Sequence, residues 1–171
     1  MARSNRERDA ALAAVYARIP PMAPPCDGRC WHACGPIDMA HRERQRIREA
    51  GVRISHYTDA LASPTAFYCE ALTADRRCKV YPLRPLICRL WGAIESLPCP
   101  FGCRPVGGPL SDQEGIQLLV EAFQAGGGGF DHVTPAMVAA MFRDPKVMAE
   151  WDAVLARGRA GEALRRAEPE R

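Results

Sequence analysis

The sequence predicts one mainly α domain with a small β-hairpin, in which irregular cysteine-rich segments surround a metal. Three observations predict this fold: apolar residues at helical spacing towards both ends, eight cysteines between them, and many prolines and glycines. A chain of 171 residues suits one sizeable core. We expect residues 1–157 to form a single cysteine-cluster metal-binding domain and the charged tail, residues 158–171, to fray.

Helix signals mark both flanks of the cysteine-rich part. Ser4, with Glu7 in capping-box position, predicts a helix to about residue 18, and Ser111 with Glu114 predicts another to about residue 125. The apolar residues expected to face the core there are Leu12, Val15, Tyr16, Ile19, Ile116, Leu119, Val120 and Phe123. Proline after an N-cap residue predicts two further helices, over residues 134–142 and 144–157.

A further helix is predicted over residues 39–50, with Asp38 as its cap and Gly51 past its end. Its arginines alternate along the sequence and therefore spread around the helix. We interpret this helix as solvated; a surface for a nucleic acid or an acidic partner is the alternative. Short strands are expected over residues 52–54, 66–69 and 78–81.

Charge and hydropathy narrow the classes of partner. The net charge of +3 is too small to indicate nucleic-acid binding by itself. No apolar run approaches the length of a membrane helix, and residues 1–9 lack the apolar stretch of a signal peptide. We therefore expect a cytoplasmic protein without membrane contact, whose partner, still unknown, would be another protein or a redox partner.

The cysteines are the candidate ligands. Thiols stay reduced in the cytosol, so a cysteine-dense cytosolic chain binds metal more often than it forms disulfides. An exported disulfide protein is the alternative, which the lack of a signal sequence disfavours. The candidate metal ligands are Cys26, Cys30, Cys34, Cys69, Cys78, Cys88, Cys99 and Cys103.

Residues 69–91 form the segment around which we expect the rest of the protein to be organised. A turn after Thr73 predicts a hairpin that brings Cys69 towards Cys78, and Pro85 opens a short helical turn that carries Cys88. Backbone N–H groups at that helix start would favour thiolates. Nearby Arg and Lys should also lower the pKa of these thiols. The five cations of the segment are Arg76, Arg77, Lys79, Arg84 and Arg89.

The same segment carries a recognisable pattern: a cysteine, a short turn, a second cysteine, an aliphatic–tyrosine pair, Arg-Pro, Cys-Arg and an aromatic residue. These elements stand as Cys69, Cys78, Val80-Tyr81, Arg84-Pro85, Cys88-Arg89 and Trp91. In this pattern the chain resembles the YkgJ-like cysteine-cluster family of zinc- or iron-chelating proteins. It is also distantly similar to the cluster domain of flagellin lysine methylases. The resemblance implies a bound metal, above all an iron–sulfur cluster, and names no reaction.

The upstream and downstream cysteines leave the ligand set open. In a straight helix Cys26 and Cys34 would stand about 12 Å apart, so this segment either wraps as a loop or supplies only two ligands. The family usually ends this group in adjacent cysteines, where this chain has Gly35. His32 is a possible ligand or outer-shell donor, and Trp31 is expected to shield the site. Cys99 and Cys103 could supply a fourth ligand, join a second site or stay unliganded.

The sequence separation of the cysteines favours an iron–sulfur cluster over a zinc ion as the bound metal. Structural zinc sites usually use cysteine pairs two to four residues apart, whereas Cys69, Cys78 and Cys88 are separated more widely. Scattered thiolates suit a [4Fe-4S] cluster, and the nearby cations would balance its negative charge. Zinc is the alternative metal.

Three classes of function follow. The cluster could be structural or transfer electrons; the protein could be an iron–sulfur-dependent enzyme, redox or methyltransferase-like; or zinc could stabilise a binding module. The glycines at 126–129 lack a nucleotide-binding fingerprint, and no nucleophile motif or paired carboxylates occur. The sequence therefore assigns no catalytic residue.

Overall fold

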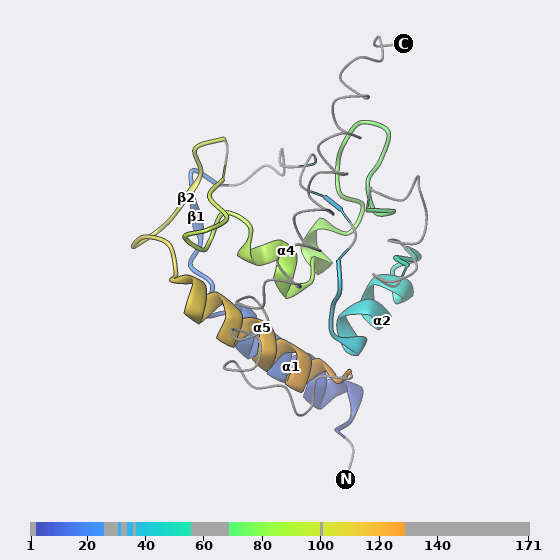
Figure 1. The fold of residues 1–171 in the computed structure, drawn as a ribbon. Helices are drawn as coiled ribbons and strands as arrows, with labels where there is room; N and C mark the ends of the chain where they lie inside the picture. The colour runs from blue at the N-terminus through green and yellow to red at the C-terminus, as the bar shows by residue number, and fades with distance from the viewer. Residues whose placement is uncertain are drawn as a thin grey trace, which may run out of the picture.

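The computed structural model describes residues 3–25, 31, 34–35, 37–55, 69–99 and 101–128. Within this part the molecule is mainly helical, with one small antiparallel sheet, as Figure 1 shows. The elements are α1 (Asn5–Tyr16), β1 (Met22–Ala23), α2 (His41–Glu49), the 3-10 helix η2 (Tyr81–Leu83), α4 (Leu86–Leu90), β2 (Arg104–Pro105) and α5 (Asp112–Gly126). The predicted fold class is confirmed.

Helices α1 and α5 begin where their capping residues predict. The Ser4 hydroxyl accepts a hydrogen bond from the backbone N–H of Glu7, and the Glu7 carboxylate accepts one from the backbone N–H of Ser4. Ser111 and Glu114 repeat this arrangement at the start of α5. Each pair satisfies N–H groups that a helix start leaves without an intrahelical partner.

The main core lies where α1, α4 and α5 meet. Figure 1 shows α5 running along α1, with α4 above the pair. On α1 the predicted Leu12 and Val15 are buried. On α5, Val120 and Phe123 are buried as predicted, but Leu118 carries the contact with this core, so the predicted face was incomplete. The core cluster consists of Leu12, Val15, Leu86, Leu90, Ile94, Leu118, Ala122 and Ala125.

A second, smaller core lies around α2 and the cysteine-rich segment. Its buried residues are Met39, Ile47, Ile54, Ala71 and Val80. Cys69 and Cys78 pack against this cluster, whereas α4, which carries Cys88, contributes to the main core. The candidate ligands therefore stand between two hydrophobic clusters.

The interpretation of α2 as a solvated helix is wrong. The side chain of Arg42 is only 9% exposed and bonds Asp9 at 2.7 Å and Glu49 at 2.9 Å. Arg44 donates to the carbonyl oxygens of Ile54 and Ser55. The arginines of this helix therefore join it to neighbouring segments through ion pairs and backbone contacts.

The helix start also differs from the prediction. The helix begins at His41, two residues later than expected, with Ala40 as the N-cap residue. The Glu43 carboxylate accepts from the Ala40 backbone N–H at 2.9 Å. Asp38 instead accepts a hydrogen bond from the backbone N–H of Met39.

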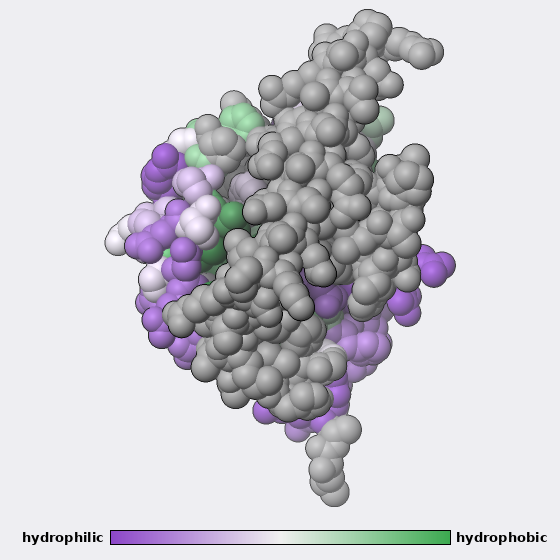
Figure 2. Space-filling view, in the orientation of Figure 1, coloured by the Kyte–Doolittle hydropathy of each residue, from purple (hydrophilic) through white to green (hydrophobic). Residues whose placement is uncertain are grey.

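The β structure lies elsewhere than predicted. The antiparallel pair joins β1 to β2, with Met22 opposite Pro105, and residues 52–54 and 78–81 form no regular strand. The large apolar residues most exposed in the described part, Phe101 at 48% and Val106 at 57%, flank β2. Figure 2 shows apolar (green) surface on the side where Figure 1 places β1 and β2.

Several predictions fall outside the described residues. They concern the strand residues 66–68, the helices over 134–142 and 144–157, and the tail. Cys26, Cys30 and His32 lie outside them as well.

Candidate metal centre

The turn between Cys69 and Cys78 folds back as a minimal hairpin. Leu72 and Cys78 form an antiparallel bridge, and the Lys79 N–H donates to the Ala71 carbonyl oxygen at 2.9 Å. Arg76 closes the turn with a φ of 63°, a left-handed conformation that residues other than glycine rarely adopt. The predicted approach of the two cysteine segments is therefore confirmed, although by one bridge and no regular strand.

Cys34 lies beside this turn. The backbone N–H of Cys69 donates to the carbonyl oxygen of Cys34 at 3.3 Å. This contact joins two segments 35 residues apart. No disulfide joins any two of the six described cysteines.

Cys88 on α4 completes a set of four thiols. Burial raises the pKa of the Cys88 thiol far above its usual value, and the nearby sulfurs of Cys69 and Cys34, and more weakly Cys78, raise it further. Arg84 lowers this pKa only in part. Burial also raises the pKa of Cys69, with a further contribution from Cys78.

The expectation that cations dominate these thiols is therefore wrong. At Cys69 and Cys88, burial and the neighbouring sulfurs raise the thiol pKa values, and at Cys88 they outweigh the opposing effect of Arg84. The expected help from the start of α4 is also limited. The Leu86 N–H donates to Glu43 at 2.8 Å, and the Cys88 N–H donates to the Pro85 carbonyl oxygen at 3.0 Å.

The chemistry of this donor set fits a metal. Buried thiolates that repel one another are stabilised by a bound cation, and thiolates are the ligands that zinc and iron–sulfur clusters prefer. Among the described residues, however, no group of three or more His, Cys, Asp or Glu side chains is already arranged around a single metal position. The four thiols are electrostatic neighbours and not a closed coordination shell.

Cys99 and Cys103 form a separate pair. Both are buried, 6% exposed each, and neither is among the groups that act on Cys88 or Cys69. Arg104 holds their loop by donating to the carbonyl oxygens of both residues. Cys99 packs close to Gly92, which leaves no room there for a larger residue.

Two arginines brace the segment that leads to Cys88. Arg84 donates from Nε to the Tyr81 carbonyl oxygen at 3.1 Å, and its guanidinium lies 3.6 Å from the Tyr81 ring centroid. Arg89 donates to the carbonyl oxygens of Arg84 and Pro82, each at 2.8 Å. These contacts fix the chain from η2 through α4, which explains the Arg-Pro and Cys-Arg pattern in physical terms.

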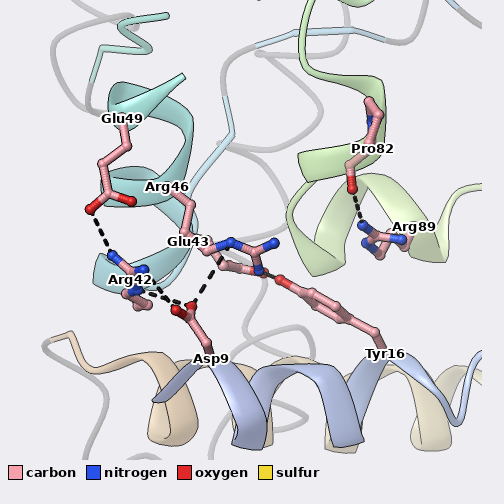
Figure 3. A network of polar contacts seen from close by, with 8 residues as sticks. All are labelled: Asp9, Tyr16, Arg42, Glu43, Arg46, Glu49, Pro82 and Arg89. Atoms are coloured by element: carbon pink, nitrogen blue, oxygen red, sulfur yellow. Dashed lines mark hydrogen bonds and ion pairs between the residues drawn. The ribbon is translucent and has the colours of Figure 1, made fainter. Parts of the chain in front are cut away.

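Glu43 is a positioning residue that the sequence analysis missed. It is 3% exposed, and one carboxylate oxygen accepts from the Tyr16 hydroxyl at 2.6 Å and from the Leu86 N–H at 2.8 Å. The other accepts from the Ala40 N–H. Figure 3 shows Tyr16 reaching from α1 to Glu43 on α2. Glu43 thus ties α1 and α2 to the helix that carries Cys88.

A glutamate three residues after a helix N-cap was the available signal. The sequence obscures this signal because Asp38 is a stronger N-cap candidate than Ala40 and stands five residues before Glu43. Burial, followed by Glu43, raises the pKa of the Tyr16 hydroxyl far above its usual value, which keeps it protonated as a donor.

Two tryptophans stand near the thiols. Arg76 lies over the Trp31 ring at 4.4 Å, which places Trp31 against the Cys69–Cys78 turn, as its expected shielding role requires. The Nε1 atom of Trp91 is buried without a hydrogen-bond partner in the described part of the chain. A buried unpaired N–H is costly.

The helices and the four grouped thiols define a small, mainly helical, cysteine-rich fold in the described residues. Residues 25–104, just under half of the chain, match the CxxCxxCC family, described as "Putative zinc- or iron-chelating domain". This match confirms the resemblance noted from the Cys69–Trp91 pattern. No curated protein and no solved structure matches the chain. Among the described residues, no helix is both long and apolar enough to cross a membrane.

Proposed function

We propose that this protein binds a [4Fe-4S] cluster through Cys34, Cys69, Cys78 and Cys88. The observation that carries this proposal is the grouping of these four half-buried cysteines. The Cys69 N–H donates to the Cys34 carbonyl oxygen, and the turn after Cys69 folds back to Cys78. The sulfurs of these three residues also raise the pKa of Cys88. They come from three segments separated by 35 and 10 residues, a spacing that suits cluster ligands supplied by scattered loops. The family description names both zinc and iron, and therefore supports a bound metal of either kind.

We propose a structural or electron-transfer role for the cluster. Two of its ligands pack on the second core and one stands on a helix of the main core. Metal-binding energy is folding energy where the ligands come together only on folding. A bound cluster would therefore join the two cores. When bound, it would also supply a one-electron redox centre.

Anaerobic purification with iron, sulfide and zinc analysis tests this proposal. We expect brown protein with iron and acid-labile sulfide in equal amounts, which loses its colour in air. A cluster that stabilises the fold should also raise the free energy of unfolding relative to chelator-treated protein.

Zinc is the second candidate, because four cysteines also form a closed structural zinc site. Colourless protein with stoichiometric zinc and no iron would assign the chain to the zinc-stabilised modules. A methyltransferase-like role would require binding of S-adenosylmethionine to the purified protein, measured by calorimetry.

A further inference from the structure

A cleft of about 220 Å³ opens beside the segment that carries Cys88. One wall is apolar and consists of residues 19–22, which lead into β1, together with Tyr16. Arg84 and Arg89 line the cleft as well and supply two cationic groups. The cleft thus combines hydrocarbon surface with two guanidinium groups.

Both guanidiniums are held in place by neutral groups. Arg89 donates to the carbonyl oxygens of Arg84 and Pro82 and lies 4.5 Å from the Tyr16 ring centroid. Arg84 donates to one carbonyl oxygen and stacks on the Tyr81 ring. These partners fix the orientation of the two cations without neutralising their charge.

No carboxylate among the described residues forms an ion pair with either arginine. Glu43 acts on Arg89 electrostatically, but its oxygens already accept three hydrogen bonds. Arg46 adds a further positive charge near Arg89. Two oriented guanidiniums therefore face this cleft with N–H groups to spare, since each guanidinium has five.

We propose that the cleft binds a small organic carboxylate. A guanidinium matches the geometry of a carboxylate with paired hydrogen bonds, and the wall formed by residues 19–22 suits a short hydrocarbon body. The volume is below the range of about 300–1,000 Å³ that is typical of larger organic ligands, which argues against a nucleotide. This inference goes beyond the proposed cluster and does not depend on it, because the contacts that hold both arginines lie outside the thiol set.

The test compares three probes on the full chain, purified anaerobically: butanoate, its neutral analogue butanamide, and inorganic phosphate. Titrations followed by NMR report on the Nε–H signals of Arg84 and Arg89. We expect butanoate to shift both signals saturably, butanamide to leave them in place, and phosphate to bind more weakly because it lacks a hydrocarbon body.

Variants locate the site. Arg89→Gln and Arg84→Gln should each weaken butanoate binding about tenfold or more, the usual cost of losing a hydrogen bond to a charged group. Arg48→Gln, on an exposed arginine outside the cleft, should leave binding unchanged. If an arginine variant fails to fold, the comparison of butanoate with butanamide on the natural chain still tests whether binding requires the carboxylate. Equal binding of the two, no saturable shift, or phosphate binding as tight as butanoate binding overturns the proposal.

Discussion

Replacement of Glu43 by glutamine tests whether a buried carboxylate positions the helix that carries Cys88. The substitution keeps the size of the side chain but exchanges one acceptor oxygen for an NH₂ group. Glu43 accepts from Tyr16, Leu86 and Ala40. In either amide orientation at least one of these donors meets another donor.

The magnitude follows from these contacts. A buried donor without an acceptor costs about 1–3 kcal/mol, and hydrogen bonds to a charged group are worth roughly twice neutral ones. We therefore expect Glu43→Gln to lower the free energy of unfolding by roughly 2–4 kcal/mol. The loss should also speed the release of metal to a chelator, because the Leu86 N–H lies two residues before Cys88.

Glu114→Gln is the matched control. Glu114 holds the same position relative to its helix start and accepts from the Ser111 N–H at 2.8 Å, but it is exposed. Its replacement should lower the free energy of unfolding by much less than Glu43→Gln does, because an exposed carboxylate is replaced by water at little cost. Urea titrations of preparations with equal metal content measure both variants. A cost for Glu43→Gln no larger than that for Glu114→Gln would refute the positioning role.

Three further predictions concern the thiols and the charges around them. Cys34→Ser should abolish metal loading, measured by metal analysis, whereas Cys103→Ser should keep the proposed cluster; the reverse result would redraw the ligand set. The hydrogen bond from Arg42 holds the pKa of Asp9 below its usual range, so Asp9 adds stability above its unfolded-state pKa, which is lost below about pH 4. Asp9→Asn should therefore flatten the acid limb of a stability–pH profile, and an unchanged limb would contradict this. Arg84→Ala should still load metal, unlike Cys34→Ser, but should lose its colour in air faster than the natural chain does; failure to load metal would make Arg84 indispensable to the centre.

Local signals predicted the starts of α1, α4 and α5. Serine followed by glutamate three residues later marked the starts of α1 and α5, because a capping box acts within one helical turn. Pro85 likewise marked the start of the short helix α4. Position in the sequence also predicted that Cys69 and Cys78 approach each other, since a short turn joins them.

Contacts between distant segments were not predictable from such signals. Nothing in the sequence indicates that the Cys34 carbonyl oxygen accepts a hydrogen bond from the Cys69 N–H, 35 residues further along the chain. Arg42 reads as a solvent-facing residue in sequence, yet tertiary packing buries it between Asp9 and Glu49. The pKa values of Cys69 and Cys88 are raised where the sequence predicts that they are lowered, for a related reason. Sequence shows how many cations are near in the chain, but not how much water burial removes from the sulfur.

The most direct test of the proposed cluster is Mössbauer spectroscopy with iron and sulfide analysis on anaerobic protein. The chain and its four single variants, Cys34→Ser, Cys69→Ser, Cys78→Ser and Cys88→Ser, should be compared. We predict about four irons and four sulfides per natural chain, as a [4Fe-4S] centre requires, and loss of the signal in each variant. Zinc without iron in the natural chain would contradict the proposed cluster. Full cluster loading in any one of the four variants would contradict the proposed set of ligands.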